Sequence, residues 1–508
     1  MRAFSSPLLQ AVVCSVSLGA ILKANAVDFS YWKYYGIPNL VMSEVEWCEY
    51  LYSEYHWKEM VTYYDPSLSR YAIEGSDPVR TYHCGNKYAS APAYTFGQVY
   101  WVTISCENGS VLDRSTGACS SPEQKGRQDT TLFCSNPSSF VGNPINASTG
   151  NKYEEEVDFE LGKIDPIVIS RFYNSTDGRW RHSYSDSIFF GEGVVVLEHS
   201  DGRQALFAPV GNSFKSNADN GTIDLNGGIW TYSSPSGSRM IFSSAGTLEK
   251  KVNPAGLEQK ITYEKLGVDR RLKIQNSSNQ NATLLEDPFH QPKTLNSDGL
   301  NIKYDYDIRH YLISKTKSVQ NSAPMVRKYH YELPGREHLL TGITDERGIR
   351  FATWEYDNQN RGISSQHSNG AGRTQVSYNA DGSSIVTNEL GKQALISYVL
   401  VGNLIRISSI KGEPSPNCAA SNSSYTYNDR GQILTKTDAK GVITTYTYNE
   451  RGMETQRTEA TGTGIARTFT TDWDASRSLP IRTVGPNSTI YYRYDDEGRE
   501  LSRETTAH

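Results

Sequence analysis

The stretch Tyr446-Thr-Tyr448-Asn449-Glu-Arg-Gly452 holds the two features that decide the fold of this chain. Its tyrosines are two residues apart, a spacing that places both rings on one face of a β-strand. The four residues that follow begin with Asn and end with Gly. Such a block is typical of a hairpin turn, because the first side chain caps the local backbone and glycine accepts the positive φ that returns the chain.

The same strand and turn recur along the second half of the sequence. Aromatic anchors in the last third follow one another at spacings of 21, 25 and 21 residues: they are Tyr427, Tyr448, Trp473 and Tyr494. A unit of about 21 residues supplies two short strands and two turns. Each strand face is only half apolar, so a unit gains stability by stacking on its neighbours. We therefore predict a mostly β protein in which antiparallel β-hairpin repeats form a curled sheet or partial hollow shell over residues 201–508. The motif residues expected to be structural are Tyr425, Tyr427, Gly431, Tyr446, Tyr448, Gly452, Tyr492, Tyr494 and Gly498.

Composition and the N-terminus indicate an exported protein of about three domains. The 508 residues include 33 Tyr against 15 Phe, as strand-rich proteins favour. Residues 1–26 have a positive start, an apolar stretch and a small-x-small cleavage pattern, which predicts a signal peptide and a location in the periplasm, on the cell surface or outside the cell. Its removal leaves 49 basic and 56 acidic residues, a balance that disfavours nucleic acid as a partner. No later apolar stretch is long enough for a transmembrane segment.

The cysteines predict a disulfide-containing N-terminal module, rich in tyrosine, over residues 27–135. Five of the six cysteines that follow the signal lie there, at positions Cys48, Cys84, Cys106, Cys119 and Cys134. Clustered cysteines in an exported chain are typical of disulfides. Cys106 and Cys119 bracket a short hairpin and are the favoured pair, with Cys48 and Cys84 as further candidates. The odd cysteine is either free or bonded to Cys418. The spacing lacks the paired C-x-x-C of a zinc site, so we expect no metal and no cofactor.

The repeat blocks resemble the YD repeat of Rhs proteins, of insecticidal Tc-toxin C subunits and of animal teneurins. Upstream, the blocks that begin at Gly142, Asp158, Arg171 and Trp180 look like the conserved domain of unknown function that heads many bacterial Rhs proteins, which favours a bacterial origin. We place this domain at residues 136–200. The residues that carry this second resemblance are Asn143, Pro144, Gly150, Asp158, Arg171, Tyr173, Trp180 and His182.

The resemblance implies a hollow β-shell that encloses a C-terminal toxin domain, which an aspartyl self-cleavage at an Asp-Pro-x-Gly segment cuts free. This sequence departs from that pattern, because it reaches His508 with no such segment and no toxin module. We therefore expect a non-catalytic exported scaffold whose cargo is a separately encoded toxin or Rhs-type chain. The alternative is an envelope or extracellular protein that binds glycans or proteins in adhesion. A truncated product without activity is the third reading.

Two sequence features contain residue types used in catalysis, but their spacing favours a structural role for both. Glu154-Glu155-Glu156 could supply paired carboxylates, yet neighbours on a strand alternate faces, and we expect these acids to form a solvated strand edge. His182 and Ser183 point apart on a strand for the same reason, and no G-x-S-x-G elbow occurs. The sequence thus predicts no enzyme. Inward-facing aromatic residues would favour a shell, and outward-facing clusters would favour adhesion.

Overall fold

The computed structural model describes residues 26–34, 61–63, 81–86, 94–107, 109–114, 117–120, 125–126, 137–216, 218–402, 404–412, 422–495 and 498–508. Within these ranges the chain consists of β-strands and one 3-10 helix, η1 (Ser368–Gly370). The prediction of a mostly β protein built from antiparallel hairpins is confirmed. No helix in the described part is long and apolar enough to cross a membrane.

In the described part of the chain, eleven strands precede the main sheet and form four small sheets. The first, in the order β1-β4-β3-β2, consists of β1 (Val27–Tyr34), β2 (Val61–Tyr63), β3 (Thr81–Asn86) and β4 (Tyr94–Cys106). Two hairpins follow, β5 (Val111–Asp113) with β6 (Ala118–Ser120), and β7 (Phe140–Val141) with β8 (Ile145–Asn146). The inner sheet, in the order β11-β10-β9, consists of β9 (Tyr153–Leu161), β10 (Ile167–Asn174) and β11 (Trp180–His182).

The remaining 30 strands form one antiparallel meander, here called the repeat wall, in which each strand pairs with the next along the chain. They are β12 (Ser187–Gly191), β13 (Val194–Glu198), β14 (Gln204–Val210), β15 (Ser213–Lys215), β16 (Thr222–Asn226), β17 (Ile229–Ser233), β18 (Arg239–Phe242), β19 (Leu248–Val252), β20 (Glu258–Leu266), β21 (Asp269–Gln275), β22 (Asn281–Glu286), β23 (Pro292–Ser297), β24 (Leu300–Tyr306), β25 (Leu312–Val319), β26 (Met325–His330), β27 (Gly342–Thr344), β28 (Arg350–Tyr356), β29 (Gly362–His367), β30 (Thr374–Tyr378), β31 (Ser384–Thr387), β32 (Gln393–Val401), β33 (Leu404–Gly412), β34 (Ser423–Tyr427), β35 (Ile433–Thr437), β36 (Ile443–Tyr448), β37 (Glu454–Glu459), β38 (Arg467–Trp473), β39 (Pro480–Val484), β40 (Ser488–Tyr494) and β41 (Glu500–Ala507). The wall begins at Ser187, so β12 and β13 lie on the N-terminal side of the boundary that the sequence placed at residue 200.

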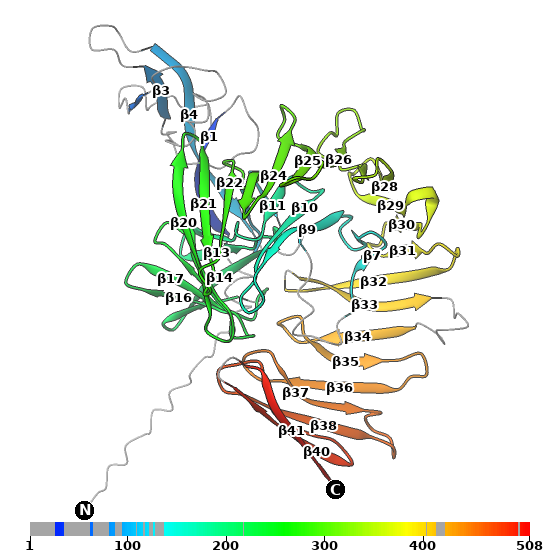
Figure 1. The fold of residues 1–508 in the computed structure, drawn as a ribbon. Helices are drawn as coiled ribbons and strands as arrows, with labels where there is room; N and C mark the ends of the chain where they lie inside the picture. The colour runs from blue at the N-terminus through cyan, green and yellow to red at the C-terminus, as the bar shows by residue number, and fades with distance from the viewer. Residues whose placement is uncertain are drawn as a thin grey trace, which may run out of the picture.

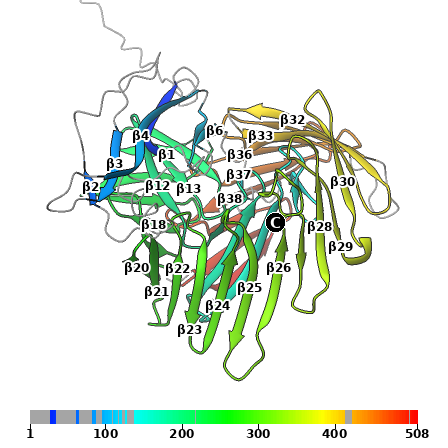
Figure 2. The same cartoon turned by 90° about the horizontal axis from the view of Figure 1, so that it is seen from above.

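The repeat wall curls until its late strands lie beside its early ones (Figure 1). At this seam the Ser478 hydroxyl, in the turn between β38 and β39, donates a hydrogen bond to the carbonyl oxygen of Pro235, in the turn between β17 and β18. Seen from above, the inner sheet lies within the curl (Figure 2). One hydrophobic core joins the inner sheet to the inner face of the wall, from Ile167 and Trp180 to Leu284 and Trp354.

Regular β-bulges explain the curvature. The register between neighbouring strands shifts immediately before the second aromatic of many units, at Tyr306, Tyr356, Tyr427, Tyr448 and Tyr494. A bulge bends its strand and increases the local twist. Repetition of this irregularity along the wall therefore turns a flat meander into a curl.

The turns after the anchors have the predicted chemistry. The Asn428 side-chain oxygen accepts hydrogen bonds from the backbone N–H groups of Arg430 and Gln432, each at 3.0 Å, and Gly431 has a φ of 72°. Other turns place His290, His310 or Asn360 at the position of that glycine, with φ values of 59°, 64° and 64°. The repeat therefore extends through units that an Asp/Asn-x-x-Gly pattern alone does not detect.

In eight of the described motifs the second aromatic ties its unit to the preceding one. Its hydroxyl or indole N–H donates a hydrogen bond to a backbone carbonyl oxygen 14 to 20 residues earlier. The pairs are Tyr263 with Leu248, Tyr306 with Pro292, Tyr356 with Leu340, Tyr378 with Gly362, Tyr427 with Ile407, Tyr448 with Ile433, Trp473 with Glu454, and Tyr494 with Pro480. Phe could fill the same space but could not donate, which accounts for the excess of tyrosine.

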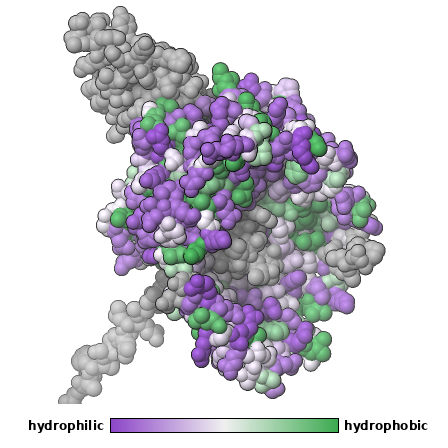
Figure 3. Space-filling model, viewed as in Figure 1, coloured by the Kyte–Doolittle hydropathy of each residue, from purple (hydrophilic) through white to green (hydrophobic). Residues whose placement is uncertain are grey.

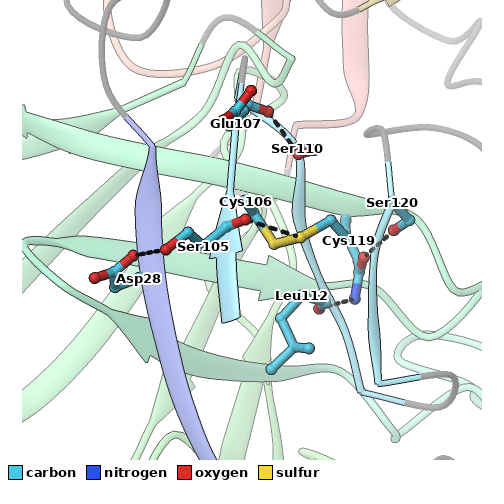
Figure 4. Close-up of a disulfide and its surroundings, with 9 residues drawn as sticks. Asp28, Ser105, Cys106, Glu107, Ser110, Leu112, Cys119 and Ser120 are labelled. Atoms are coloured by element: carbon cyan, nitrogen blue, oxygen red, sulfur yellow. Dashed lines mark hydrogen bonds between the residues drawn. A yellow bond between two sulfur atoms is a disulfide. The ribbon is translucent and has the colours of Figure 1, made fainter. Parts of the chain in front are cut away.

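The N-terminal module contacts the start of the wall. Cys106 and Cys119 form a disulfide, as predicted, with their Cα atoms 5.5 Å apart (Figure 4). Phe29 and Cys106 pack against Val196 of β13, whose other face meets the central core. The signal residues 1–25 and Cys48, Cys134 and Cys418 lie outside the described residues. Cys84 lies on β3, and its predicted pairing stays a prediction.

We predict that Tyr356→Phe lowers the urea midpoint of unfolding by an amount equivalent to about 1–2 kcal/mol, because it removes the 2.7 Å hydrogen bond to the buried Leu340 carbonyl. Tyr491→Phe is the matched control, since Tyr491 is 45% exposed, and its midpoint should stay at the wild-type value. Equal midpoints for the two variants would show that the anchor hydroxyls contribute nothing to the wall.

Candidate functional site inside the curled sheet

Arg171 on β10 is the centre of the largest buried ionic cluster on the inner sheet. Its side chain is fully buried. The guanidinium pairs with two acids of the neighbouring strand β9: Nη2 lies 2.5 Å from Glu156 Oε2, and Nε donates to Asp158 Oδ2. Register explains the arrangement, because Arg171 lies directly opposite Glu156 in the β9–β10 pair. The inner sheet thus supplies one cation and two anions on a single face.

The repeat wall completes the cluster from β24, β25 and β26. Lys315 Nζ lies 2.9 Å from Asp158 Oδ1 and 3.3 Å from Glu156 Oε2. Arg327 Nη1 lies 3.1 Å from Glu156 Oε1, and its Nε pairs with Glu346. The hydroxyl of Tyr329 donates to Glu156 at 2.7 Å, and that of Tyr304 donates to Asp158 at 2.8 Å. Three cations therefore face three carboxylates.

Aromatic faces enclose the Arg171 guanidinium. Its Cζ lies 4.7 Å from the Trp180 ring centroid, 5.1 Å from that of Tyr304 and 5.4 Å from that of Tyr329. Guanidinium groups are weakly hydrated and stack well on rings, so this environment suits arginine better than lysine. One nitrogen, Nη1, has no hydrogen-bond partner.

The cluster is ionised at neutral pH. Burial by itself would raise the pKa of Asp158, but Arg171 and Lys315 outweigh it and lower the pKa to about 2. Burial also opposes ionisation of Glu156, and Arg171, Lys315 and Arg327 together keep the pKa of Glu156 below its ordinary value. These charges stabilise one another only while inner sheet and wall stay together.

A second buried pair joins β11 to the wall. His182 Nε2 lies 2.6 Å from Glu286 Oε2, and Glu286 also pairs with Arg270 at 2.5 Å. Burial lowers the pKa of His182 despite the opposing effect of Glu286, so the imidazole is neutral at pH 7 and donates to the carboxylate. Ser183 is directed instead to the backbone of Ser170. The histidine therefore positions a strand and does not activate the neighbouring hydroxyl.

Further residues of the same motif also contact the wall. The Tyr173 hydroxyl donates to the His338 carbonyl at 2.7 Å and accepts from the Leu340 N–H at 2.8 Å. Trp180 Nε1 donates to the Tyr331 hydroxyl at 3.1 Å. Both strands β10 and β11 are thereby tied to the loop and strands that surround β26.

The segment before β9 fits against the turn between β28 and β29. The Asn143 carbonyl accepts a hydrogen bond from Trp354 Nε1 at 2.6 Å, and the Gly150 carbonyl accepts one from the Gly362 N–H at 2.8 Å. Gly150 has a φ of 82°, and a Cβ there would lie 2.3 Å from the Cβ of Arg361. Pro144 accepts from the Tyr153 N–H at 3.2 Å and so fixes the entry into β9. Seven of the eight residues of the upstream motif thus contact the wall directly or through their ion pairs, and Pro144 supports the entry into β9.

The expectation that the acidic run is a solvated edge is wrong for its last member. Glu156 is only 8% exposed, and its carboxylate contacts Arg171 on the inner sheet and Lys315, Arg327 and Tyr329 on the wall. The sequence of β9 alone contains no sign of these wall partners. The wall residues Lys315, Arg327, Tyr304 and Tyr329 were not singled out from the sequence. The basic residues that pair with Glu156 and Asp158 can be identified only when it is known which wall strands lie over β9. Among the described residues, no group of three His, Cys, Asp or Glu is placed to hold a metal ion.

Two family models match parts of this sequence. The domain of unknown function DUF6531 matches residues 142–207, which include the inner sheet, and the RHS repeat matches residues 427–463, which include β36 and its turns. The chain thus contains an RHS repeat and a DUF6531 domain. The DUF6531 match covers the motif that forms the boundary between inner sheet and wall, and it also takes in the first three strands of the wall.

Solved structures give more distant likenesses. Two are crystal structures of TcdB2-TccC3, one without its hypervariable C-terminal region and one of TcdB2-TccC3-Cdc42. Each is 12% identical to this chain, with TM-scores of 0.31 and 0.32 over 75% and 86% of it. The chain spans 20% and 27% of the length of those two chains. A porin-like protein from Bacteroides uniformis is 8% identical over 71% of this chain and 97% of its own, with a TM-score of 0.13. No curated protein matches the sequence.

We predict that Asp158→Asn lowers the free energy of unfolding by about 3–5 kcal/mol, because it leaves Arg171 and Lys315 buried with one carboxylate fewer. Asp305→Asn is the control: Asp305 pairs with Lys303 at 2.5 Å on a side chain that is 34% exposed, so its loss should cost less than about 1 kcal/mol. Urea unfolding followed by tryptophan fluorescence measures both. A loss for Asp158→Asn no larger than that for Asp305→Asn would contradict a central role for the cluster.

The difference in stability between wild type and Asp158→Asn should also depend on pH. The pKa of Asp158 is about 2 in the folded protein against 3.8 for the free side chain, so its charge stabilises the fold fully above about pH 4. That contribution is lost as pH falls through the folded pKa. The gap between the urea midpoints of the two proteins should therefore shrink between pH 4 and pH 2, and a constant gap over this range would argue against an ionised Asp158.

Proposed function

We propose that this RHS-repeat protein is an exported, non-catalytic scaffold whose curled wall holds and shields a cargo segment on its inner face. The cargo is a toxin or Rhs-type polypeptide encoded as a separate chain. Export rests on the signal-like residues 1–26 and on the disulfide between Cys106 and Cys119, since disulfides persist in oxidising compartments.

The orientation of the repeat aromatics is the observation that supports a shell. Tyr304 and Tyr329 reach the inner sheet, which defines the inner face of the wall. Residues paired across neighbouring strands lie on the same face of a sheet, so the inner face can be followed along the wall. In the late strands it includes the pairs Tyr425 with Lys436 and Tyr446 with Arg457. Tyr425 and Tyr446 are buried in a core of their own on this face. An adhesion surface built on the repeat aromatics would need them on the outer face.

The late strands leave part of the inner face uncovered. A hollow of about 720 Å³ opens there between β35 and β38. Its lining includes Thr444 and Tyr446, the basic residues Lys436, Arg457 and Arg467, and the acidic residues Asp438 and Glu459. The surface seen in Figure 3 is mostly hydrophilic. A space of this size matches the volume of ordinary ligand pockets.

The contacts of the early strands with β9 indicate which kind of segment the hollow could bind. Lys315 lies opposite Tyr304 on the wall and binds Glu156 and Asp158 of the inner strand β9. Lys436 occupies the same position opposite Tyr425. Because the repeat places a cation beside a tyrosine at both sites, an extended cargo segment that carries carboxylates fits the late strands as β9 fits the early ones.

Cysteine labelling tests the shielding. We expect Thr444→Cys, on the inner face, to react with a small maleimide but about tenfold more slowly with a long polyethylene glycol maleimide, relative to the same ratio for the control Thr447→Cys. Thr447 lies on the same strand with its side chain on the opposite, exposed face. Wild-type protein corrects for native cysteines. Equal ratios at the two positions would mean that the inner face is as open as the outer one, and would overturn the proposal.

A further inference from the structure

The seam of the curl contains a second cavity that the scaffold function does not use. It has a volume of about 530 Å³ and lies where the turns of the early strands β16 to β19 meet the turns after β36 and β38. Contacts across the seam are close: the Ser478 hydroxyl binds the Pro235 carbonyl, and a Cβ on Gly452 would lie 3.0 Å from the Asn220 side chain. Both walls of the cavity therefore belong to a fixed junction.

The charged residues that line the cavity are all basic. Three arginines, Arg239, Arg451 and Arg477, come from both sides of the seam, and hydroxyl or amide groups of Ser233, Ser234, Ser476, Thr222 and Asn220 surround them. No Asp or Glu is among the described residues that line the cavity. Asp219, next to Asn220, is directed elsewhere, to His199 at 3.3 Å and to the Tyr232 hydroxyl at 2.9 Å.

Two of the three guanidinium groups form no ion pair with a carboxylate of the described residues. Arg451 donates to the backbone carbonyl oxygens of Asp474 and Arg477, which hold the side chain in place without neutralising it. Arg239 is exposed on β18 and forms no ion pair with a described residue. Arg477 differs, because its Nη2 pairs with Asp474 Oδ2 at 3.1 Å. The cavity thus carries about two net positive charges beside hydroxyl donors.

The hydroxyl of Ser234 is held in position by its neighbours. The Ser234 hydroxyl lies 2.7 Å from those of Ser236 and Ser238, in the turn between β17 and β18. Guanidinium forks and hydroxyls are the donors that bind tetrahedral oxyanions in proteins, because they offer several N–H and O–H groups to the three outer oxygens of the anion.

We propose that this cavity, here called the seam site, binds a sulfate or phosphate ester carried on a larger ligand, with Arg239 and Arg451 as its principal charged contacts. The volume exceeds that of one tetrahedral anion and leaves room for the sugar or chain that bears it. Because the two arginines belong to opposite sides of the seam, a bound ester also ties the late strands of the wall to the early ones.

Isothermal titration calorimetry on the full-length mature protein tests the seam site. The probes are sodium sulfate, sodium phosphate, a heparin hexasaccharide and inorganic triphosphate, each at an ionic strength matched with sodium chloride because screening alters surface electrostatics. We expect saturable binding of at least one probe. Preference for the sulfated sugar identifies a sulfate ester as the natural group, and preference for triphosphate identifies a phosphate; both support the site.

Variants separate the seam site from general charge. Arg239→Gln should weaken binding about fivefold with an unchanged melting temperature, since Arg239 makes no described side-chain contact, and Arg239→Gln with Arg451→Gln should weaken it at least about tenfold. Arg482→Gln is the control, because Arg482 lies on β39 outside the cavity and pairs with Asp472; it should bind like wild type. Absence of binding to all four probes, or equal binding by wild type and the double variant, would overturn the proposal.

Discussion

The buried guanidinium of Arg171 is the constraint on which the arrangement of inner sheet and wall depends. An arginine cannot lose its proton in a protein, so a fully buried one must be surrounded by acceptors and polarisable rings. Glu156 and Asp158 on the adjacent strand supply the acceptors, yet two carboxylates need more than one cation. Lys315 and Arg327 of the wall supply the additional cations. A shift of one residue in the pairing of β25 would turn Lys315 to the outer face and leave buried charge unpaired.

Two devices of different range shape the wall. Bulges before many of the anchor tyrosines, together with the hydroxyl bonds that these tyrosines make to the preceding unit, bend the wall by local means. The inner sheet and the hairpin before it act at longer range. The cluster around Arg171 and the His182–Glu286 pair fix two parts of the wall to the inner sheet, and the Trp354–Asn143 hydrogen bond fixes a third part to the β7–β8 hairpin. The late strands have no such support among the described residues, and their core around Tyr425 and Tyr446 is separate and smaller.

The sequence predicted the repeat well because the repeat is local. Spacing of two between aromatics, a capping Asn or Asp, and a residue with positive φ three positions later are all settled within one hairpin, as at Tyr446 to Gly452. Units that use His290 or His310 in place of glycine were harder to recognise, since the left-handed conformation costs these residues more and the surrounding sheet has to stabilise it. The pairing of Cys106 with Cys119 was also a local inference, and it is confirmed.

The sequence by itself determined the all-β class, the hairpin unit and its turns, because these follow from neighbours a few residues apart. Only the tertiary structure decided the role of the upstream motif. Glu156 looked like part of a solvated edge, and its partners Lys315 and Arg327 lie more than 150 residues away in strands whose position depends on the summed curvature of the wall. The seam site follows the same logic: Arg239 and Arg451 share a cavity because the curl brings its ends together. Small bends add up over many strands, and no short stretch of sequence contains their sum.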